Sequence, residues 1–132
     1  MSTNSLSVSK PELKLIYKKL GGEPKLLALL RDFYDRMSND ALIGFFFEAK
    51  DLKAIASKQM AFLQKAMGAA ETYSGKAPAQ AHEDLAPILK GHFDRRLKIL
   101  EGTLRDYGLT DQEVKTWIGF ENAFRSAVMK KD

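Results

Sequence analysis

The 132-residue sequence predicts a single all-α domain, and three observations support that fold class. Apolar residues recur at steps of three and four along most of the chain, which is the spacing of amphipathic helices. No run of alternating apolar and polar residues between turn residues is long enough to indicate a β-sheet. Gly21-Gly22, Gly68 and Gly108 stand where the periodic runs stop, as expected at the C-termini of helices.

The first two helices have clear start and stop signals. The first begins near Pro11, because proline fits the first helical position, and it ends at Gly21-Gly22. The second begins at Pro24 and runs to about Met37.

A short turn and a long helix follow. Asn39 or Asp40 can cap the turn, which ends in the aromatic run "FFF" at 45–47. The long helix is predicted over 51–67 and is closed by Gly68.

The last part of the chain is predicted to hold one extended loop and three helices. The loop spans 69–78, and the short helix after it is interrupted at Pro87. A long helix follows over 91–107. The last helix is opened by Thr110, which makes a capping box with Glu113.

Composition limits the classes of function that the chain can have. With 45% hydrophobic residues it can bury one core over 11–132, and we expect residues 1–10 to form a flexible segment. The absence of cysteine excludes thiol catalysis, iron–sulfur clusters and disulfides. The net charge is +4, but the basic residues are scattered along the chain, so we expect no nucleic-acid partner. Residues 1–9 lack a secretory signal and the longest apolar run, 41–47, is too short to cross a bilayer; we expect a cytoplasmic protein without a membrane partner.

Three polar side chains interrupt the apolar faces of three different helices. They are Tyr34 in the second helix, Gln59 in the third and His82 in the short helix after the loop. Each has an ordinary explanation by itself: a core tyrosine with one hydrogen bond, a glutamine that caps a backbone group, or a satisfied core histidine. Burying an unpaired polar group costs about 1 to 3 kcal/mol. Three such residues beside a phenylalanine cluster therefore favour a shared apolar cavity for a small ligand or cofactor.

The two histidines of the chain, His82 and His92, cannot both bind one metal ion. Ten residues of helix correspond to a rotation of about 1000 degrees, which is about 80 degrees short of whole turns. The two rings would therefore face different directions even if Pro87 did not interrupt the helix. At most one of them is the ligand.

Six motifs resemble those of the truncated haemoglobins, and in particular the bacterial type of their first group, also called N-type. The motifs are "IYKKLGG" at 16–22, "DFYDRM" at 32–37, "FFF" at 45–47, "KQMAFL" at 58–63, "MGAAETYSG" at 67–75, and "AH" at 81–82 followed by "HF" at 92–93. Successive spacings along Tyr34, Phe47, Gln59 and His82 are 13, 12 and 23 residues, without a gap against the family pattern. The resemblance covers residues 13 to about 110 and implies a shortened globin fold, a two-over-two helical sandwich around haem.

The resemblance assigns the iron to one histidine. In the family, the histidine of the short helix after the extended loop holds the haem iron, and this position falls on His82. His92 is then a structural residue or one that supports the iron ligand from behind, and Phe93 packs beneath the haem. The last helix has no histidine, which removes the covalent haem attachment of cyanobacterial relatives, so the resemblance implies non-covalent haem b.

The resemblance also implies which residues meet the gas and the haem. Tyr34 and Gln59 resemble the hydrogen-bond donors that hold dioxygen in high-affinity members, since bound dioxygen takes on superoxide character. Ile55 occupies the place of the distal histidine of vertebrate globins and cannot donate. The other haem contacts are Phe46, Phe47 and Phe62 in the apolar wall, Leu63 where some members have a gating phenylalanine, and Lys58 and Tyr73 at the propionates.

Two positions leave alternatives open. Lys58 pairs with a haem propionate or, if it loses its proton, binds the iron itself when no gas is present, as in some algal relatives. Ala69 follows Gly68 where the family has a second glycine. The alanine would cost about 1 kcal/mol, or shift the loop, if that position needs a positive φ.

The function implied is reversible binding of dioxygen, nitric oxide and carbon monoxide by a monomer. Nitric oxide dioxygenation is a further activity of such a site, in which bound oxygen converts nitric oxide to nitrate and a separate reductase restores ferrous iron. A haem-based redox or gas sensor, or an electron-transfer protein, is the alternative. If the resemblance is wrong, the chain is an all-α domain that binds no haem.

Overall fold

In the computed structural model, residues 10–82 and 86–129 are described, and every regular element in these ranges is helical. The predicted flexible segment lies outside them except for Lys10, which begins the first helix. The elements are α1 (Lys10–Leu20), α2 (Glu23–Ser38), the 3₁₀-helix η1 (Gly44–Phe47), α3 (Leu52–Ala66), α4 (Pro78–Ala81), α5 (Lys90–Asp106), α6 (Asp111–Asn122) and α7 (Arg125–Val128).

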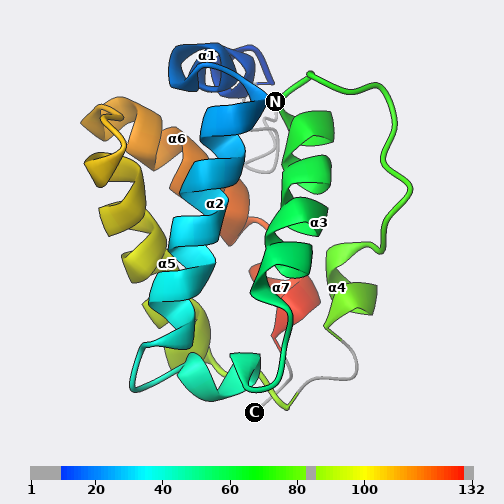
Figure 1. The fold of residues 1–132 in the computed structure, drawn as a ribbon, viewed down its shortest axis with the longest axis vertical. Coiled ribbons are helices and arrows are strands. Elements are labelled where there is room, and N and C mark those ends of the chain that lie inside the picture. Colours follow the sequence, from blue (N-terminus) through cyan, green and yellow to red (C-terminus); the bar gives the residue numbers. More distant parts are fainter. Residues whose placement is uncertain (1–9, 83–85, 130–132) are drawn as a thin grey trace.

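Four helices make two packed pairs. Helix α2 packs against α3, α5 packs against α6, and α2 also contacts α5, which joins the pairs. In Figure 1, α2 and α3 run side by side, α5 flanks α2, and α1 lies across one end. The two-over-two arrangement expected from the sequence is therefore confirmed.

The core between the two pairs is mainly apolar. Side chains from all four helices are at most 1% exposed there, among them Leu30 and Phe33 of α2, Leu63 of α3, Leu104 of α5 and Trp117 of α6. Burial of such residues is the main force that holds the pairs together.

The turn after α2 depends on one carboxylate and one glycine. Asp40, one of the two predicted caps, accepts hydrogen bonds from the backbone N–H groups of Leu42 and Ile43 at 3.0 and 3.2 Å. A Cβ at Gly44 would lie 2.6 Å from the carbonyl oxygen of Ser38, so only glycine lets the chain pass this close to the end of α2. These contacts set the position of η1.

Helix α3 ends in a Schellman motif that removes the expected cost of Ala69. Gly68 has φ +77°, its N–H donates to the carbonyl of Lys65, and the N–H of Ala69 donates to the carbonyl of Gln64 at 2.8 Å. Ala69 itself does not have a positive φ. The alanine therefore fits without strain, because only Gly68 occupies the left-handed position.

The chain after α5 confirms one prediction and corrects another. The Thr110–Glu113 capping box is present, with hydrogen bonds of 2.7 and 3.2 Å. The single last helix expected from the sequence is instead divided into α6 and α7. The backbone tightens at the junction, where the N–H of Phe124 donates to Glu121 three residues earlier, and the Phe124 ring packs against Phe62 at 5.5 Å.

None of the helices within the described ranges is long and apolar enough to cross a membrane.

Candidate functional site

His82 follows the short helix α4, which the loop after α3 brings back to the level of the first half of α3 (Figure 1). Its Nδ1 lies 2.7 Å from the carbonyl oxygen of Pro78. A carbonyl oxygen only accepts hydrogen bonds, so Nδ1 carries a proton, and in the neutral ring the lone pair is then on Nε2. This tautomer is the one that a metal-binding histidine adopts when its other nitrogen is held by the protein.

His92 has a different role, which the sequence prediction did not specify. Its Nδ1 accepts a hydrogen bond from the backbone N–H of Leu89 at 3.0 Å and so caps the start of α5. Its ring also makes edge contacts with Phe45 and Phe46, at centroid distances of 5.7 and 5.1 Å. These two ring contacts join η1 to α5.

Tyr34 lies on α2 with only 7% of its surface exposed. Its ring contacts Phe33 at 5.4 Å and meets Phe47 edge-on at 6.0 Å. Burial raises the pKa of the Tyr34 phenol above its ordinary value, against an opposing effect of the Arg96 positive charge. The hydroxyl therefore keeps its proton at neutral pH and can donate it in a hydrogen bond.

Helix α3 presents one face that the protein covers only in part. Ile55, Gln59 and Phe62 lie at steps of four and three along this face and are all half-buried, whereas Leu63 is fully buried in the core. Lys58 is exposed beside this face. A row of half-exposed apolar side chains around one amide is the surface that a flat apolar group would cover.

The loop after α3 places Tyr73 against the same face. Its ring contacts Phe62 edge-on at 5.4 Å, and its hydroxyl donates to the backbone carbonyl of Lys76 at 2.8 Å. A Cβ at Gly75 would lie 2.4 Å from the Tyr73 hydroxyl, so glycine makes this close turn possible. The sequence placed Tyr73 at a propionate, and the structure gives its hydroxyl a partner within the loop.

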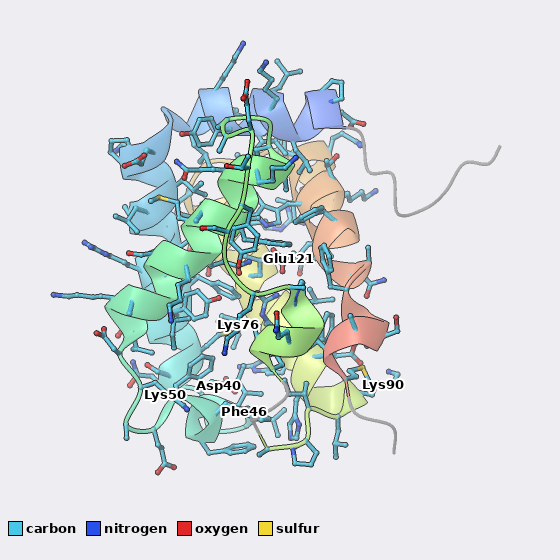
Figure 2. All side chains as sticks on the ribbon, turned by 90° about the vertical axis from the view of Figure 1, so that its right-hand side faces the viewer. Asp40, Phe46, Lys50, Lys76, Lys90 and Glu121 are labelled. Atoms are coloured by element: carbon cyan, nitrogen blue, oxygen red, sulfur yellow. The ribbon has the colours of Figure 1, made fainter. Side chains whose placement is uncertain are left out.

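Phe46 and Phe47 come from η1, and both are half-buried. Phe46 packs against Phe45 at 4.1 Å. Figure 2 labels Phe46 near the end of the molecule where η1 lies. Phe93, by contrast, is 3% exposed, with the guanidinium of Arg125 over its ring at 4.7 Å.

Sequence reasoning missed a partly buried ion pair between α5 and α6. Arg96 of α5 forms an ion pair of 2.6 Å with Glu121 of α6, and Glu121 also accepts a hydrogen bond from Nε1 of Trp117 at 3.2 Å. Figure 2 labels Glu121 in the middle of the helical assembly. A signal was available, because Glu121 interrupts the apolar face of α6 formed by Val114 and Trp117 at steps of three and four.

The donor set fits haem better than a bare metal ion. Among the residues that the structure describes, no group of three or more histidine, cysteine, aspartate or glutamate side chains could hold a metal. A porphyrin brings four nitrogen ligands of its own, so its iron needs only one protein ligand. His82 is the candidate for that single ligand. The half-buried face of α3 is a candidate contact of the porphyrin, and the phenol of Tyr34 is a candidate donor to a bound gas.

Comparison with known proteins agrees with this geometry. The bacterial-like globin family matches residues 15–130. The chain is 36% identical over 100 residues to the group 1 truncated hemoglobin of the alga Chlamydomonas moewusii, which covers 75% of this chain and 58% of the algal protein. It is 33% identical over 104 residues to that of the ciliate Tetrahymena pyriformis, covering 79% of this chain and 84% of the relative.

The structure also resembles the solved truncated hemoglobin of Tetrahymena pyriformis in its Fe(III) form. The TM-score is 0.79 at 29% identity, and the match covers 88% of this chain and 98% of that one. The same ciliate protein has been solved with a tyrosine replaced at its position 25, and with glutamines replaced at its positions 46 and 50. The relatives with the highest identity here are algal and ciliate, so the bacterial origin implied by the sequence motifs is supported only in part. The chain belongs to the bacterial-like globin family, as a haem-binding globin of the group 1 truncated type.

Proposed function

We propose that this globin binds haem b non-covalently through Nε2 of His82, and that its ferrous haem reversibly binds dioxygen, nitric oxide and carbon monoxide. The observation that carries the proposal is the 2.7 Å contact between Nδ1 of His82 and the Pro78 carbonyl. That contact selects the tautomer with the lone pair on Nε2, which is the form that coordinates iron. Haem bound there would supply an iron that can take a gas as a further ligand.

On the gas side, we propose that Tyr34 and Gln59 donate the hydrogen bonds. Support comes from the ciliate protein, because its substituted positions 25, 46 and 50 have the same spacing as Tyr34, Ile55 and Gln59. The first and third positions carry tyrosine and glutamine in both chains. The middle position is glutamine in the ciliate protein and isoleucine here.

Ile55 leaves this site with one hydrogen-bonding side chain fewer than the ciliate protein has at these positions. Isoleucine can neither donate nor accept, so Tyr34 and Gln59 have to supply the bonds. A hydrogen bond to a charged group contributes about 1.5 to 3 kcal/mol, against about 1 kcal/mol for a neutral pair. Both residues would donate to the same bound oxygen, but the phenol of Tyr34 is buried while the amide of Gln59 is half-buried and open to competition from water. We therefore expect Tyr34 to provide the larger part of the stabilisation of bound oxygen.

The remaining site residues would enclose the haem. The proposed apolar contacts are Phe46, Phe47, Ile55, Phe62, Leu63 and Phe93. Lys58 is exposed next to the half-buried face of α3 and so can reach a propionate at the rim. Tyr73 is the weaker candidate for a propionate contact, because its hydroxyl already donates to the carbonyl of Lys76.

Non-covalent attachment is proposed because the chain has no histidine after His92. A neighbour with the same fold, the 2/2 hemoglobin from Synechococcus, has been solved with covalently attached heme, at 22% identity to this chain. Extraction with acid and butanone separates the alternatives. Complete release of haem is expected, and haem that stays with the protein would contradict non-covalent binding.

The experiment that tests the function is a titration of the haem-free protein with haemin, followed by reduction and exposure to oxygen or carbon monoxide. We expect saturation at one haem per chain and distinct, reversible oxy and carbon monoxide spectra. A haemin spectrum that does not change with added protein would refute haem binding. Immediate oxidation by oxygen, without an oxy form, would favour the electron-transfer or sensor alternative.

Nitric oxide dioxygenation is proposed as a second reaction of the same oxy form. The chain itself would only hold and orient the bound oxygen through Tyr34 and Gln59, while a separate reductase supplies electrons. Adding nitric oxide to the oxy protein should give one equivalent of nitrate and ferric haem. Recovery of free nitric oxide with little nitrate would exclude this reaction.

A further inference from the structure

The segment that carries His82 takes its position from a neighbouring helix. Helix α4 has only four residues, which are too few to form a stable helix in water without packing. His82 is tied to the start of α4, because its Nδ1 lies 2.7 Å from the carbonyl oxygen of Pro78. The main packing partner of α4 among the described elements is α7, and the two helices lie side by side in Figures 1 and 2. The placement of His82 therefore depends on the placement of α7.

Helix α7 is equally short, so its own position is set by side-chain contacts. Phe124, which precedes it, packs its ring against Phe62 of α3 at 5.5 Å and against Phe120 of α6 at 5.2 Å. These ring contacts place the start of α7 relative to α3 and α6. They do not join α7 to α5.

Arg125, the first residue of α7, makes the link to α5. Its Nη2 donates to the carboxylate of Asp94 at 2.7 Å, and its guanidinium carbon lies 4.7 Å from the centroid of the Phe93 ring. Its Nε donates to Oδ1 of Asn122, at the end of α6, at 3.0 Å. A guanidinium is planar and rigid, so a carboxylate, an amide and an aromatic ring together hold it in one orientation. Arg125 therefore fixes α7 against α5 and α6 at once.

Stability does not account for this arrangement. The side chains of Arg125 and Asp94 are 30% and 41% exposed, and ion pairs this open to water add little to the free energy of folding. Asp94 also has a partner on its own helix, since Lys90 donates to its other carboxylate oxygen at 2.8 Å. What Arg125 adds is a fixed connection between α7, which supports α4, and α5, which carries the proposed haem contact Phe93.

We propose that Arg125 is a positioning residue for the iron ligand: by fixing α7 against α5, it sets where α4 presents Nε2 of His82 to the iron. The same guanidinium holds the ring of Phe93 in place. This inference rests on the proposed binding of haem through His82. Arg125 acts through α7 and α4 and needs no contact of its own with the haem.

The test compares Arg125→Met with Lys90→Met in the haem-bound protein. Both variants remove one cation from the carboxylate of Asp94, but only Arg125 belongs to α7 and lies over the Phe93 ring. The first measurement is the iron–histidine stretching band of the ferrous, gas-free protein, read by resonance Raman spectroscopy. This band reports the orientation and strain of the bond at Nε2. The second measurement is the rate of haemin release to an excess of haem-free myoglobin.

Arg125→Met should shift or broaden the iron–histidine band and speed haemin release about threefold, because a partly exposed ion pair and a cation–π contact are lost. Arg125→Lys keeps the charge without the planar fork and should fall between Arg125→Met and wild type. Lys90→Met should leave both measurements as in wild type. The stretching band of bound carbon monoxide reports the gas side and should stay unchanged in all three variants.

Several results would overturn the proposal. One is an unchanged iron–histidine band in Arg125→Met, and another is an equal change in Lys90→Met. Shifts of both the iron–histidine band and the carbon monoxide band would show that Arg125 supports the whole fold instead of the iron ligand. If Arg125→Met does not fold, Arg125→Lys decides, and a wild-type iron–histidine band in that variant contradicts the positioning role.

Hydrogen exchange of the haem-free protein separates this proposal from the proposed function. If the wild-type protein takes up no haem, the proposed function fails. Peptides over 123–129 should still lose protection in Arg125→Met and keep it in Lys90→Met, and equal protection in both would overturn the link between α7 and α5 as well. If wild-type protein binds haem with an iron–histidine band that Arg125→Met leaves unchanged, only the positioning role fails.

Discussion

The two sides of the candidate haem site are built very differently. His82 follows a helix of only four residues, which packs mainly against the equally short α7. Tyr34 lies in the 16-residue α2, which contacts α1, α3, α5 and η1, and its ring is buried against Phe33 and Phe47. Local stability follows the number of buried contacts. We therefore expect the proposed gas side, at Tyr34, to be formed by the protein alone, and the proposed iron side, at His82, to need haem to complete its packing.

The largest expected effect is the loss of the iron ligand. His82→Ala should abolish stable haem binding, or give an abnormal spectrum, because the other histidine caps a different helix. The measurement is haemin affinity by absorbance. His92→Ala is the matched control, and it should keep a near-normal oxy spectrum and lose about 1 kcal/mol of stability with its cap. Reversed outcomes would make His92 the ligand.

The next largest effect is expected on the gas side, at Tyr34. Tyr34→Phe removes one hydrogen bond to a charge-separated ligand, so dioxygen release should become about tenfold faster or more. Carbon monoxide release, measured by stopped flow in the same protein, should change much less. If the release rates of dioxygen and carbon monoxide rise by the same factor, Tyr34 acts by packing alone.

Gln59→Leu should have a smaller effect of the same kind. The amide of Gln59 would donate to the same oxygen, but it lies on the half-buried face of α3, where water competes for the bond. A contribution of about 1 kcal/mol there corresponds to roughly fivefold faster dioxygen release. Comparing the two variants ranks the donors. A larger effect for Gln59→Leu than for Tyr34→Phe would contradict the assignment of Tyr34 as the main donor.

Lys58 should give the smallest effect. Its exposed position favours a propionate contact over iron ligation. The ferric spectrum of wild-type protein and of Lys58→Ala should both remain high-spin up to the transition from bound water to hydroxide. A low-spin form that appears as pH rises in wild type and is absent in Lys58→Ala would show that the amine binds the iron.

Most of the fold followed from local signals in the sequence. Pro11, Gly68 and the Thr110–Glu113 box marked helix ends that the structure has at or within two residues of those places. The division of the last helix could not be read in this way. It depends on the packing of Phe124 against Phe62, a contact between residues 62 positions apart that no local pattern reports.

The sequence selected candidate site residues where a polar residue breaks an apolar face. That rule selected Tyr34, Gln59 and His82, and the structure places them on α2, on α3 and directly after α4. The same rule was not applied to Glu121, although it breaks the face of α6. Arg96 could not be found from its own helix, because long charged side chains usually reach solvent, and its burial depends on Glu121 from another helix.

Hydrogen exchange with and without haem tests the difference between the two sides most directly. Peptides that cover 70–82, read by mass spectrometry, should gain more than about tenfold protection when haem binds, because haem completes the packing of this segment. Peptides within α2 should already be protected without haem and change much less. Equal gains in both segments, or a larger gain in α2, would show that haem organises the whole domain and would contradict a gas side formed by the protein alone.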